Sequence, residues 1–351
     1  MSKVILTGSQ GFIGSYICNE LLAHGYEVVG FDNFSKYGRV VRAHDSHPNF
    51  TLIEDDITKW NKNAPILECL KDAEHFIACA AMIGGISYFH KYAYDLIANN
   101  ERILANSFDL SIRLYQEHKL RKVTVLSSSM VYENCTIYPT PEGHERVCPP
   151  PSSTYGFQKL SSEYFAQGAW EQYNLPYTII RPFNCIGVGE DESIQDSEIT
   201  SGNVKLMLSH VVPDLINKTI KGQNPIHILG EGHQVRCYTN GKDIARGIRL
   251  SLENNLSCLR DYNISTGQVT TVLELAKLIW EKINPNKPFA YISDEPFEYD
   301  VQKRIPDVSR AKKELGFEAE ISLEQSVDEV IKYFQKKEEE SCGANHYYTN
   351  Q

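Results

Sequence analysis

Residues 4–14 read VILTGSQGFIG, and this stretch decides the fold of the chain. Its first four residues are apolar or β-branched, as is typical of a buried parallel strand. Glycines follow at positions 8, 11 and 14, and apolar residues then recur at helical spacing. In a strand–turn–helix unit, Gly8 allows the tight turn, Gly11 lets a phosphate approach the backbone, and Gly14 lets the helix pack closely on the strand. Free amides at such a helix start bind phosphate, so a dinucleotide site that includes Phe12 and Ile13 is predicted.

Acidic residues follow the next two predicted strands. The strand at 27–31 leads into Asp32 and Asn33. A carboxylate about 20 residues after the glycines binds the adenosine ribose hydroxyls and would repel a 2′-phosphate, which favours NAD over NADP. The strand at 50–53 is followed by an acidic run that ends in Asp56 and Ile57. A carboxylate there could meet the adenine amino group, although a solvated strand end has the same sequence.

The composition is that of a soluble globular protein. The chain has 351 residues, of which 42% are hydrophobic and 23% charged, enough for one large domain or two smaller ones. Its net charge of −10 argues against nucleic acid or an anionic membrane as a partner. No run approaches ~18 apolar residues, and the first strand leaves no room for a signal peptide. The nine cysteines are scattered without a Cys-x-x-Cys pair, so we expect reduced cytoplasmic thiols and no metal site.

Strand and helix patterns alternate through the first half of the chain. Further strands are predicted at 73–79, 122–126 and 176–180, with helices at 94–118 and 152–173. This alternation predicts an α/β fold with a doubly wound parallel (Rossmann) sheet over residues 1–181, and ligands at the carboxyl ends of its strands.

The pattern loosens after residue 181. We predict a smaller α/β substrate-binding domain made of 182–236 and 266–335, with 237–265 returning to the first domain. Residues 336–351 are expected to form a polar, frayed tail. Helices are expected near 204–221, 240–253, 271–284 and 322–335.

Tyr155 and Lys159 lie four residues apart and therefore on one face of a helix. They follow a proline-rich loop and, before it, a strand that ends in the serines 127–129. A tyrosine with a pKa of ~10 is a poor base at neutral pH, but a nearby ammonium and a cationic nicotinamide ring would stabilise its phenolate. Ser128 can hydrogen-bond the same substrate oxygen. The glycine turn and this pair predict a protein that holds a nicotinamide cofactor and moves a hydride.

The chain resembles the extended short-chain dehydrogenase/reductase family, in its nucleotide-sugar epimerase/dehydratase branch, over about residues 3–335. The resemblance implies NAD, a nucleoside-diphosphate sugar and a homodimer formed through the helices at 94–118 and 152–173. It implies a catalytic set of Ser128, Tyr155 and Lys159. Further cofactor contacts are implied at Ala80, Ala81 and Asn100, and substrate contacts at Met130, Asn184, His210, Arg236 and Arg304. The motifs that carry it lie at 7–14, 32–33, 56–57, 80–81, 127–132, 155–159, 181–184, 230–236 and 304–307.

The residues after Ser128 bear on the reaction. Ser129 and Met130 stand where similar dehydratases carry Asp-Glu, and the glutamate of similar decarboxylases is also absent. GDP-sugar 3,5-epimerases have a cysteine where Met130 stands, and a thioether cannot exchange a proton. Two segments nevertheless resemble that GDP-sugar group: residues 81–86, and residues 209–213, where His210 could act as acid or base or could simply line the pocket.

The leading hypothesis is an epimerase of the UDP-glucose 4-epimerase type, which inverts C4 through a 4-keto intermediate. A GDP-sugar 3,5-epimerase or ketoreductase that uses His210, or a dehydratase, is the alternative among enzymes. A catalytically silent NAD-binding scaffold on the same fold is the alternative outside them.

Overall fold

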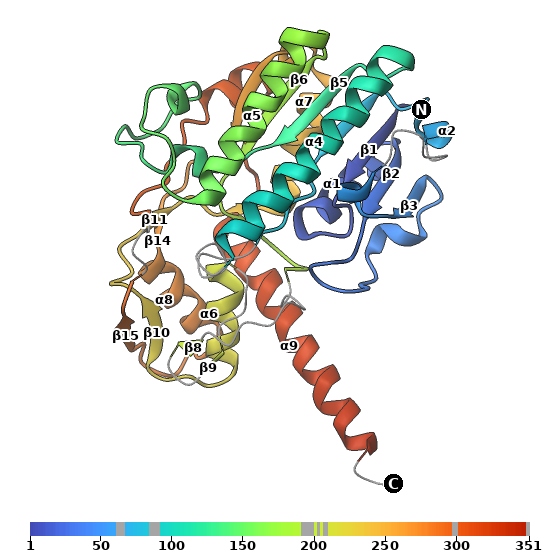
Figure 1. The fold of residues 1–351 in the computed structure, drawn as a ribbon. Coiled ribbons are helices and arrows are strands. Elements are labelled where there is room, and N and C mark those ends of the chain that lie inside the picture. Colours follow the sequence, from blue (N-terminus) through green and yellow to red (C-terminus); the bar gives the residue numbers. More distant parts are fainter. Residues whose placement is uncertain are drawn as a thin grey trace.

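A seven-stranded parallel sheet forms the larger part of the molecule (Figure 1). The computed structural model describes residues 1–60, 67–83, 92–190, 200–201, 204–205, 210–296 and 301–348. The strand order β13-β6-β5-β4-β1-β2-β3 reverses direction between β1 and β4, which is where ligands bind in such sheets. This confirms the predicted fold class. The strands are β1 (Lys3–Thr7), β2 (Glu27–Asp32), β3 (Phe50–Glu54), β4 (His75–Ala78), β5 (Lys122–Leu126), β6 (Tyr177–Pro182) and β13 (Arg260–Ile264).

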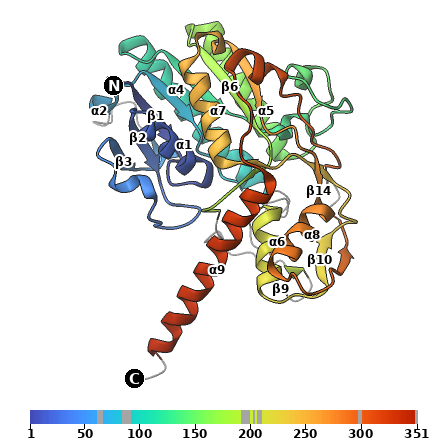
Figure 2. The ribbon, with the colours of Figure 1, turned by 180° about the vertical axis from the view of Figure 1, so that it is seen from behind.

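Helices cover both faces of this sheet, and each face has its own apolar core (Figures 1 and 2). On one face α1 (Phe12–Ala23) packs against α7 (Gly241–Glu253); on the other α4 (Ala93–Glu117) packs against α5 (Thr154–Tyr173). Because β13 pairs with β6 and α7 packs on α1, the segment 237–265 lies with the large sheet.

A smaller unit is built around α6 (Val211–Ile220), α8 (Val272–Ile283) and α9 (Leu323–Tyr348), with Trp280 fully buried in its core. Its main strand pair is β10 (Ile226–Leu229) with β15 (Tyr291–Asp294), which run parallel. The shorter pairs are β7 (Cys185–Ile186) with β12 (Thr239–Asn240), β8 (Thr200–Ser201) with β9 (Val204–Lys205), and β11 (Val235–Arg236) with β14 (Thr270–Thr271). The short helical elements are α2 (Leu67–Leu70), η1 (Ala43–Ser46), η2 (Ile57–Lys59), η3 (Ser129–Tyr132), η4 (His144–Arg146), η5 (Asn255–Ser257) and η6 (Ala311–Leu315).

Two expected elements differ from the structure. The helix predicted over 204–221 begins only at Val211, and residues 204–205 form β9. Pro213 explains this, because proline lacks an N–H and is tolerated in the first turn of a helix but not in its interior. The expected fraying from residue 336 is also wrong, since α9 continues to Tyr348 and its end projects from the body (Figure 2). In the part of the chain that is described, no helix has both the length and the apolar character needed to cross a membrane.

Candidate functional site

The turn between β1 and α1 is formed by glycines, so no side chain at positions 8, 11 and 14 covers its backbone. Gly8 has φ of 77°, and its amide donates to the Phe31 carbonyl oxygen at 2.7 Å. A Cβ on Gly14 would lie 1.9 Å from the Gly8 carbonyl oxygen, so no side chain fits there. Gly11 is the N-cap of α1 and offers no side chain to the first-turn amides, which include those of Phe12 and Ile13. The turn therefore fits a dinucleotide phosphate, which would lie against these amides.

Asp32 lies at the end of β2 and turns its carboxylate to the glycine turn. Its oxygens accept the backbone amides of Gln10 at 2.9 Å and Phe34 at 2.8 Å. Burial raises the pKa of Asp32, although these amides and the charge of Arg42 oppose the rise. The neighbouring Asn33 is exposed and accepts the Ser35 amide at 3.1 Å. Asp32 is thus the acidic group that the structure places beside the turn.

Asp56 and Ile57 have local structural contacts. The Asp56 carboxylate accepts the Thr58 amide at 3.0 Å and so caps η2. The Ile57 side chain is buried in the core on the α4 side of the sheet, and its carbonyl oxygen accepts from Asn106 at 2.7 Å.

The segment after β4 lies opposite the glycine turn. The Thr7 hydroxyl oxygen accepts the amides of Cys79 and Ala80, each at 3.1 Å. A Cβ on Gly8 would lie 2.9 Å from the Ala80 Cα, which brings Ala80 against the turn and leaves Ala81 next in the chain. Asn100 uses both ends of its amide on the backbone of Met82, at 2.6 and 2.9 Å. Asn100 therefore fixes this segment.

Ser128, Tyr155 and Lys159 come together at the carboxyl end of β5. Ser128 is the N-cap of η3, and its hydroxyl oxygen accepts the Met130 amide at 3.2 Å. Tyr155, in the first turn of α5, is 5% exposed, and Ser128 lies near enough to its phenol to lower the pKa of that group. Lys159 Nζ lies 5.9 Å from the centre of the Tyr155 ring and donates to the Leu126 carbonyl oxygen at 2.9 Å.

The pKa of Tyr155 differs from the sequence-based expectation. Burial raises the pKa of Tyr155 to about 12, and this outweighs the lowering by the Ser128 hydrogen bond and the Arg304 charge. Burial also lowers the pKa of Lys159 to about 8. The expected acidifying effect of the lysine is therefore not produced by the protein alone, because both groups are buried.

Two of the predicted substrate-binding residues, Arg236 and Arg304, lie near each other, and Arg304 affects the pKa of Tyr155. The Arg304 amide donates to the Val235 carbonyl oxygen at 3.0 Å, and this places Arg304 beside β11 and Arg236. Arg236 Nη1 donates to the same oxygen at 2.9 Å. The charge of Arg304 lowers the pKa of Tyr155, so the guanidinium lies near enough to act on the phenol. The site thus joins an acid/base group of the large sheet to a cation of the smaller unit.

The other predicted substrate residues line the same region or flank it. Met130 is buried in a small apolar cluster with Tyr155, Leu96 and Val301. Asn184 has φ of 37° and donates from Nδ2 to the Cys237 carbonyl oxygen at 3.2 Å. The apolar cluster thus groups the Met130 thioether with Tyr155.

His210 pairs with a buried carboxylate. It is the N-cap of α6, its amide donates to Glu190 Oε1 at 3.0 Å, and its ring nitrogen Nδ1 bonds the same oxygen. Burial opposes ionisation of Glu190, but His210 and Lys36 together hold the pKa of that carboxyl below its usual range. The histidine is thereby anchored to the loop that follows β7.

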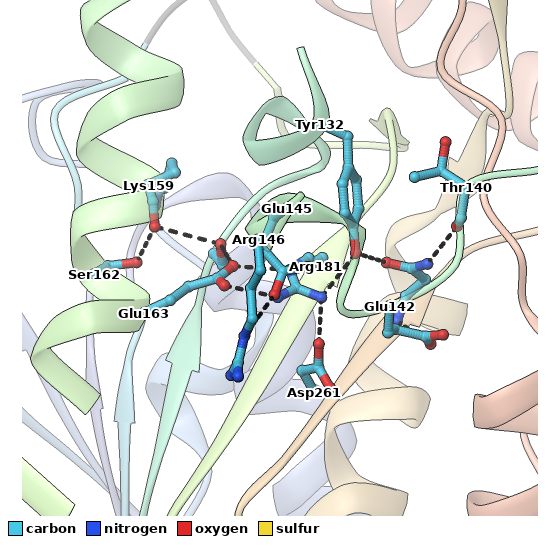
Figure 3. A network of polar contacts seen from close by, with 12 residues as sticks. Tyr132, Thr140, Glu142, Glu145, Arg146, Lys159, Ser162, Glu163, Arg181 and Asp261 are labelled. Carbon is cyan, nitrogen blue, oxygen red and sulfur yellow. Dashed lines mark hydrogen bonds and ion pairs between the residues drawn. The ribbon is translucent and has the colours of Figure 1, made fainter. Parts of the chain in front are cut away.

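A buried polar network behind α5 was not predicted (Figure 3). Arg181, at the end of β6, bonds Glu163, Glu145, Asp261 and the hydroxyl of Tyr132. Arg181 belongs to the motif at 181–184. Glu163 lies four residues after Lys159 on the same helix, and this spacing is the sequence signal that could have indicated Glu163. The network holds α5 to β6 and to η3.

No group of three or more His, Cys, Asp or Glu within the described ranges is arranged to hold a metal ion. Each cysteine whose side chain is described is a free thiol.

The comparisons with known proteins agree with this geometry. Residues 4–265 match the family model described as the NAD dependent epimerase/dehydratase family. The solved UDP-glucose 4-epimerase of Thermotoga maritima with UDP-glucose has a TM-score of 0.77 and 28% identity, over 95% of this chain and 99% of that chain. The UDP-N-acetylglucosamine 4-epimerase of Methanobrevibacter ruminantium, solved with UDP-N-acetylmuramic acid, has a TM-score of 0.74 and 25% identity, over 96% and 99% of the two chains.

Curated relatives include a different activity. UDP-glucuronic acid decarboxylase 2 of Arabidopsis thaliana is 27% identical over 339 residues, which are 95% of this chain and 68% of that protein. The family match covers well over half of the chain and contains the glycine turn, Asp32, Ser128, Tyr155 and Lys159. The chain therefore belongs to the NAD dependent epimerase/dehydratase family, as an enzyme of the extended short-chain dehydrogenase/reductase type with NAD as its cofactor.

Proposed function

We propose that this enzyme is a nucleotide-sugar epimerase that inverts C4 through a transient 4-keto sugar. The observation that carries the proposal is the grouping at the end of β5: Ser128 lies near the Tyr155 phenol and lowers its pKa, and Met130 belongs to the same buried apolar cluster as Tyr155. One acid/base group suits removal and return of hydrogen at a single hydroxyl-bearing carbon. Elimination or decarboxylation would require a second proton-transfer group where the thioether stands.

The residues take roles that follow from their contacts. When bound, NAD would supply the hydride acceptor and donor for C4. Tyr155 takes the proton of the C4 hydroxyl and later gives it back, while Ser128 bonds the same oxygen. Lys159 supplies positive charge one helical turn away, which favours the phenolate. Arg304 and Arg236 would bind the sugar diphosphate, since guanidinium groups match phosphate oxygens. Asn184 would contact the same part of the substrate. The 4-keto sugar then turns before its other face is reduced.

The predicted cofactor-binding residues can be assigned to the parts of NAD in the same way, from their positions and contacts. We assign the pyrophosphate to the amides at the start of α1, with Gly8, Gly11 and Gly14 leaving room for it. Asp32 and Asn33 would bind the adenosine ribose, and Asp56 and Ile57 would lie at the adenine. Ala80, Ala81 and Asn100 would contact the cofactor from the β4 side of the glycine turn.

A GDP-sugar epimerase or ketoreductase that uses His210 is the second candidate. The pairing of His210 with the buried Glu190 favours it, because a carboxylate orients an imidazole for proton transfer. The T. maritima structure, a 4-epimerase with UDP-glucose, supports the first candidate and a UDP-sugar substrate.

Incubation of the purified protein with UDP-, GDP-, CDP- and TDP-hexoses and with UDP-glucuronic acid tests the proposal. We expect a C4 epimer and, with substrate deuterated at C4, retention of the label in the product. Release of CO₂, a dehydrated sugar, or exchange of hydrogen at C3 or C5 would contradict C4 inversion. No turnover of any sugar would favour the silent scaffold.

We also propose a homodimer formed through α4 and α5. These two helices lie side by side and expose large aromatic residues, namely Tyr94, Phe157 and Tyr164. Sedimentation equilibrium would test this: a mass of one chain at micromolar concentration would contradict it.

A further inference from the structure

Arg42 joins two loops that leave the sheet on opposite sides of its switch point. Its Nε donates to the Gln10 carbonyl oxygen at 3.1 Å, within the glycine turn after β1. Its Nη1 donates to the Gly189 carbonyl oxygen at 3.3 Å, in the loop that follows β6 and β7. A dinucleotide in this fold lies across the crevice between the two halves of the sheet. One guanidinium therefore links the two walls of the cofactor crevice.

The loop at Gly189 is shaped around this guanidinium. Gly189 has φ of 92°, a conformation that favours glycine. A Cβ at this position would lie 2.7 Å from Arg42 Nη1. The close approach of the two residues thus depends on the missing side chain.

The remaining nitrogen of Arg42 is unused. Nη2 is buried and has no hydrogen-bond partner among the described residues. A buried donor without a partner is unfavourable, so a ligand that accepts a hydrogen bond from it would gain affinity. Because Nε of the same planar guanidinium donates to the Gln10 carbonyl oxygen, the group is held at the glycine turn, where the pyrophosphate is expected.

Arg42 lies beside a second cation and near two carboxylates. Its guanidinium donates to carbonyl oxygens, its backbone amide donates to Asp45, and its charge lowers the pKa of Asp32. Burial lowers the pKa of Lys36; the Glu190 carboxylate opposes this, and the nearby charge of Arg42 adds to it. Both cations lie over the Tyr37 ring, with Lys36 Nζ at 4.9 Å and Arg42 Cζ at 5.6 Å from its centre. A diphosphate would relieve their repulsion and would accept charge-assisted hydrogen bonds.

We propose that Arg42 clasps the cofactor: it holds the Gln10 and Gly189 loops together over the bound dinucleotide and donates Nη2 to its pyrophosphate. The clasp slows dissociation of NAD, which suits a reaction that leaves the cofactor unchanged after each turnover. The proposal depends on NAD binding, which family membership supports, and not on inversion at C4.

The test compares Arg42→Met with Arg39→Met. Arg39 lies in the same segment, is 73% exposed in its side chain and pairs with Glu54, so its loss changes the charge equally without touching either loop. The measurements are the dissociation rate of NAD from reloaded protein, in a chase with excess ligand, and the affinities for ADP and adenosine by calorimetry.

For Arg42→Met we expect NAD to dissociate at least about tenfold faster and ADP to bind about tenfold more weakly, as expected for one lost charge-assisted hydrogen bond. Adenosine affinity should stay unchanged, and Arg39→Met should stay within about twofold of the parent in every measurement.

If Arg42→Met and Arg39→Met had the same NAD dissociation rate and the same affinity for ADP, the proposed clasp would be overturned. If Arg42→Met lost affinity equally for adenosine and for ADP, the proposed contact with the pyrophosphate would be overturned. If Arg42→Met does not fold, Arg42→Lys takes its place, since one ammonium cannot reach both carbonyls with the same geometry. NAD retention by Arg42→Lys equal to that of the parent would then overturn the proposal.

Discussion

Glu163 and Arg181 form a two-pronged ion pair between side chains that are each 1% exposed. Nε lies 2.8 Å from Oε1, and Nη2 lies 2.6 Å from Oε2. The Ser127 hydroxyl also donates to Glu163 Oε1 at 2.5 Å. Because Glu163 follows Lys159 by one helical turn, this pair anchors the catalytic helix to β5 and β6.

Glu163→Gln should therefore destabilise the fold strongly. The change leaves the buried Arg181 charge without its bidentate partner, and removing one member of a buried pair costs about 3–5 kcal/mol. Urea denaturation gives the free energy of unfolding. Glu171→Gln, at an exposed position on the same helix, is the control and should change the free energy by less than about 0.5 kcal/mol. Equal stability of the two variants would show that the pair is not needed.

Tyr155→Phe should keep the fold and NAD binding but lower kcat by about 10²–10⁴, which is the contribution expected of a positioned acid/base group. Activity on the identified sugar, together with NAD content after purification, would measure both effects. Tyr291→Phe, on β15 and 42% exposed, is the matched control. Near-normal turnover of Tyr155→Phe would remove the phenol from the mechanism.

The phenol should ionise only at high pH in the cofactor-free protein. Burial raises the pKa of Tyr155 to about 12, so its ¹³C-labelled ring should titrate about two units above a free tyrosine, whose pKa is ~10. Turnover requires the phenolate as base, so the rate of hydride removal should rise with pH up to the pKa in the loaded enzyme. We expect that kinetic pKa to lie below 12, because the nicotinamide cation favours the phenolate. A cofactor-free pKa at or below the ordinary value would contradict the buried geometry.

The parts that could be predicted from sequence are local in the chain. The strand, the glycine turn and the helix of residues 4–23 are contiguous, so their spacing alone predicts the phosphate site and the fold class, which is confirmed. Pro213 is a local signal for the start of α6 at Val211, because proline is tolerated only in the first turn of a helix.

The parts that could not be predicted depend on how distant segments pack. Arg42 meets Gly189 across 147 residues of chain, and no local pattern marks either residue. Lys159 turns its ammonium to the Leu126 carbonyl because α5 packs on β5, which its spacing from Tyr155 does not reveal. Likewise the high pKa of Tyr155 follows from burial, which only the packed structure supplies.

Gly14→Ala should disrupt the glycine turn even though alanine is the better helix former. The added Cβ would lie 1.9 Å from the Gly8 carbonyl oxygen, so α1 must shift away from β1 and the first-turn amides lose their place. We expect NAD binding to fall by at least about 100-fold, since the phosphate contacts depend on these amides. Gly168→Ala on α5 is the matched control: its Cβ would meet no heavy atom within 4 Å, and the change should stabilise the fold by about 0.5–1 kcal/mol. Titration of NAD against both variants, with thermal unfolding of each, checks the contrast. Unchanged NAD affinity in Gly14→Ala would mean that the cofactor does not bind at the start of α1.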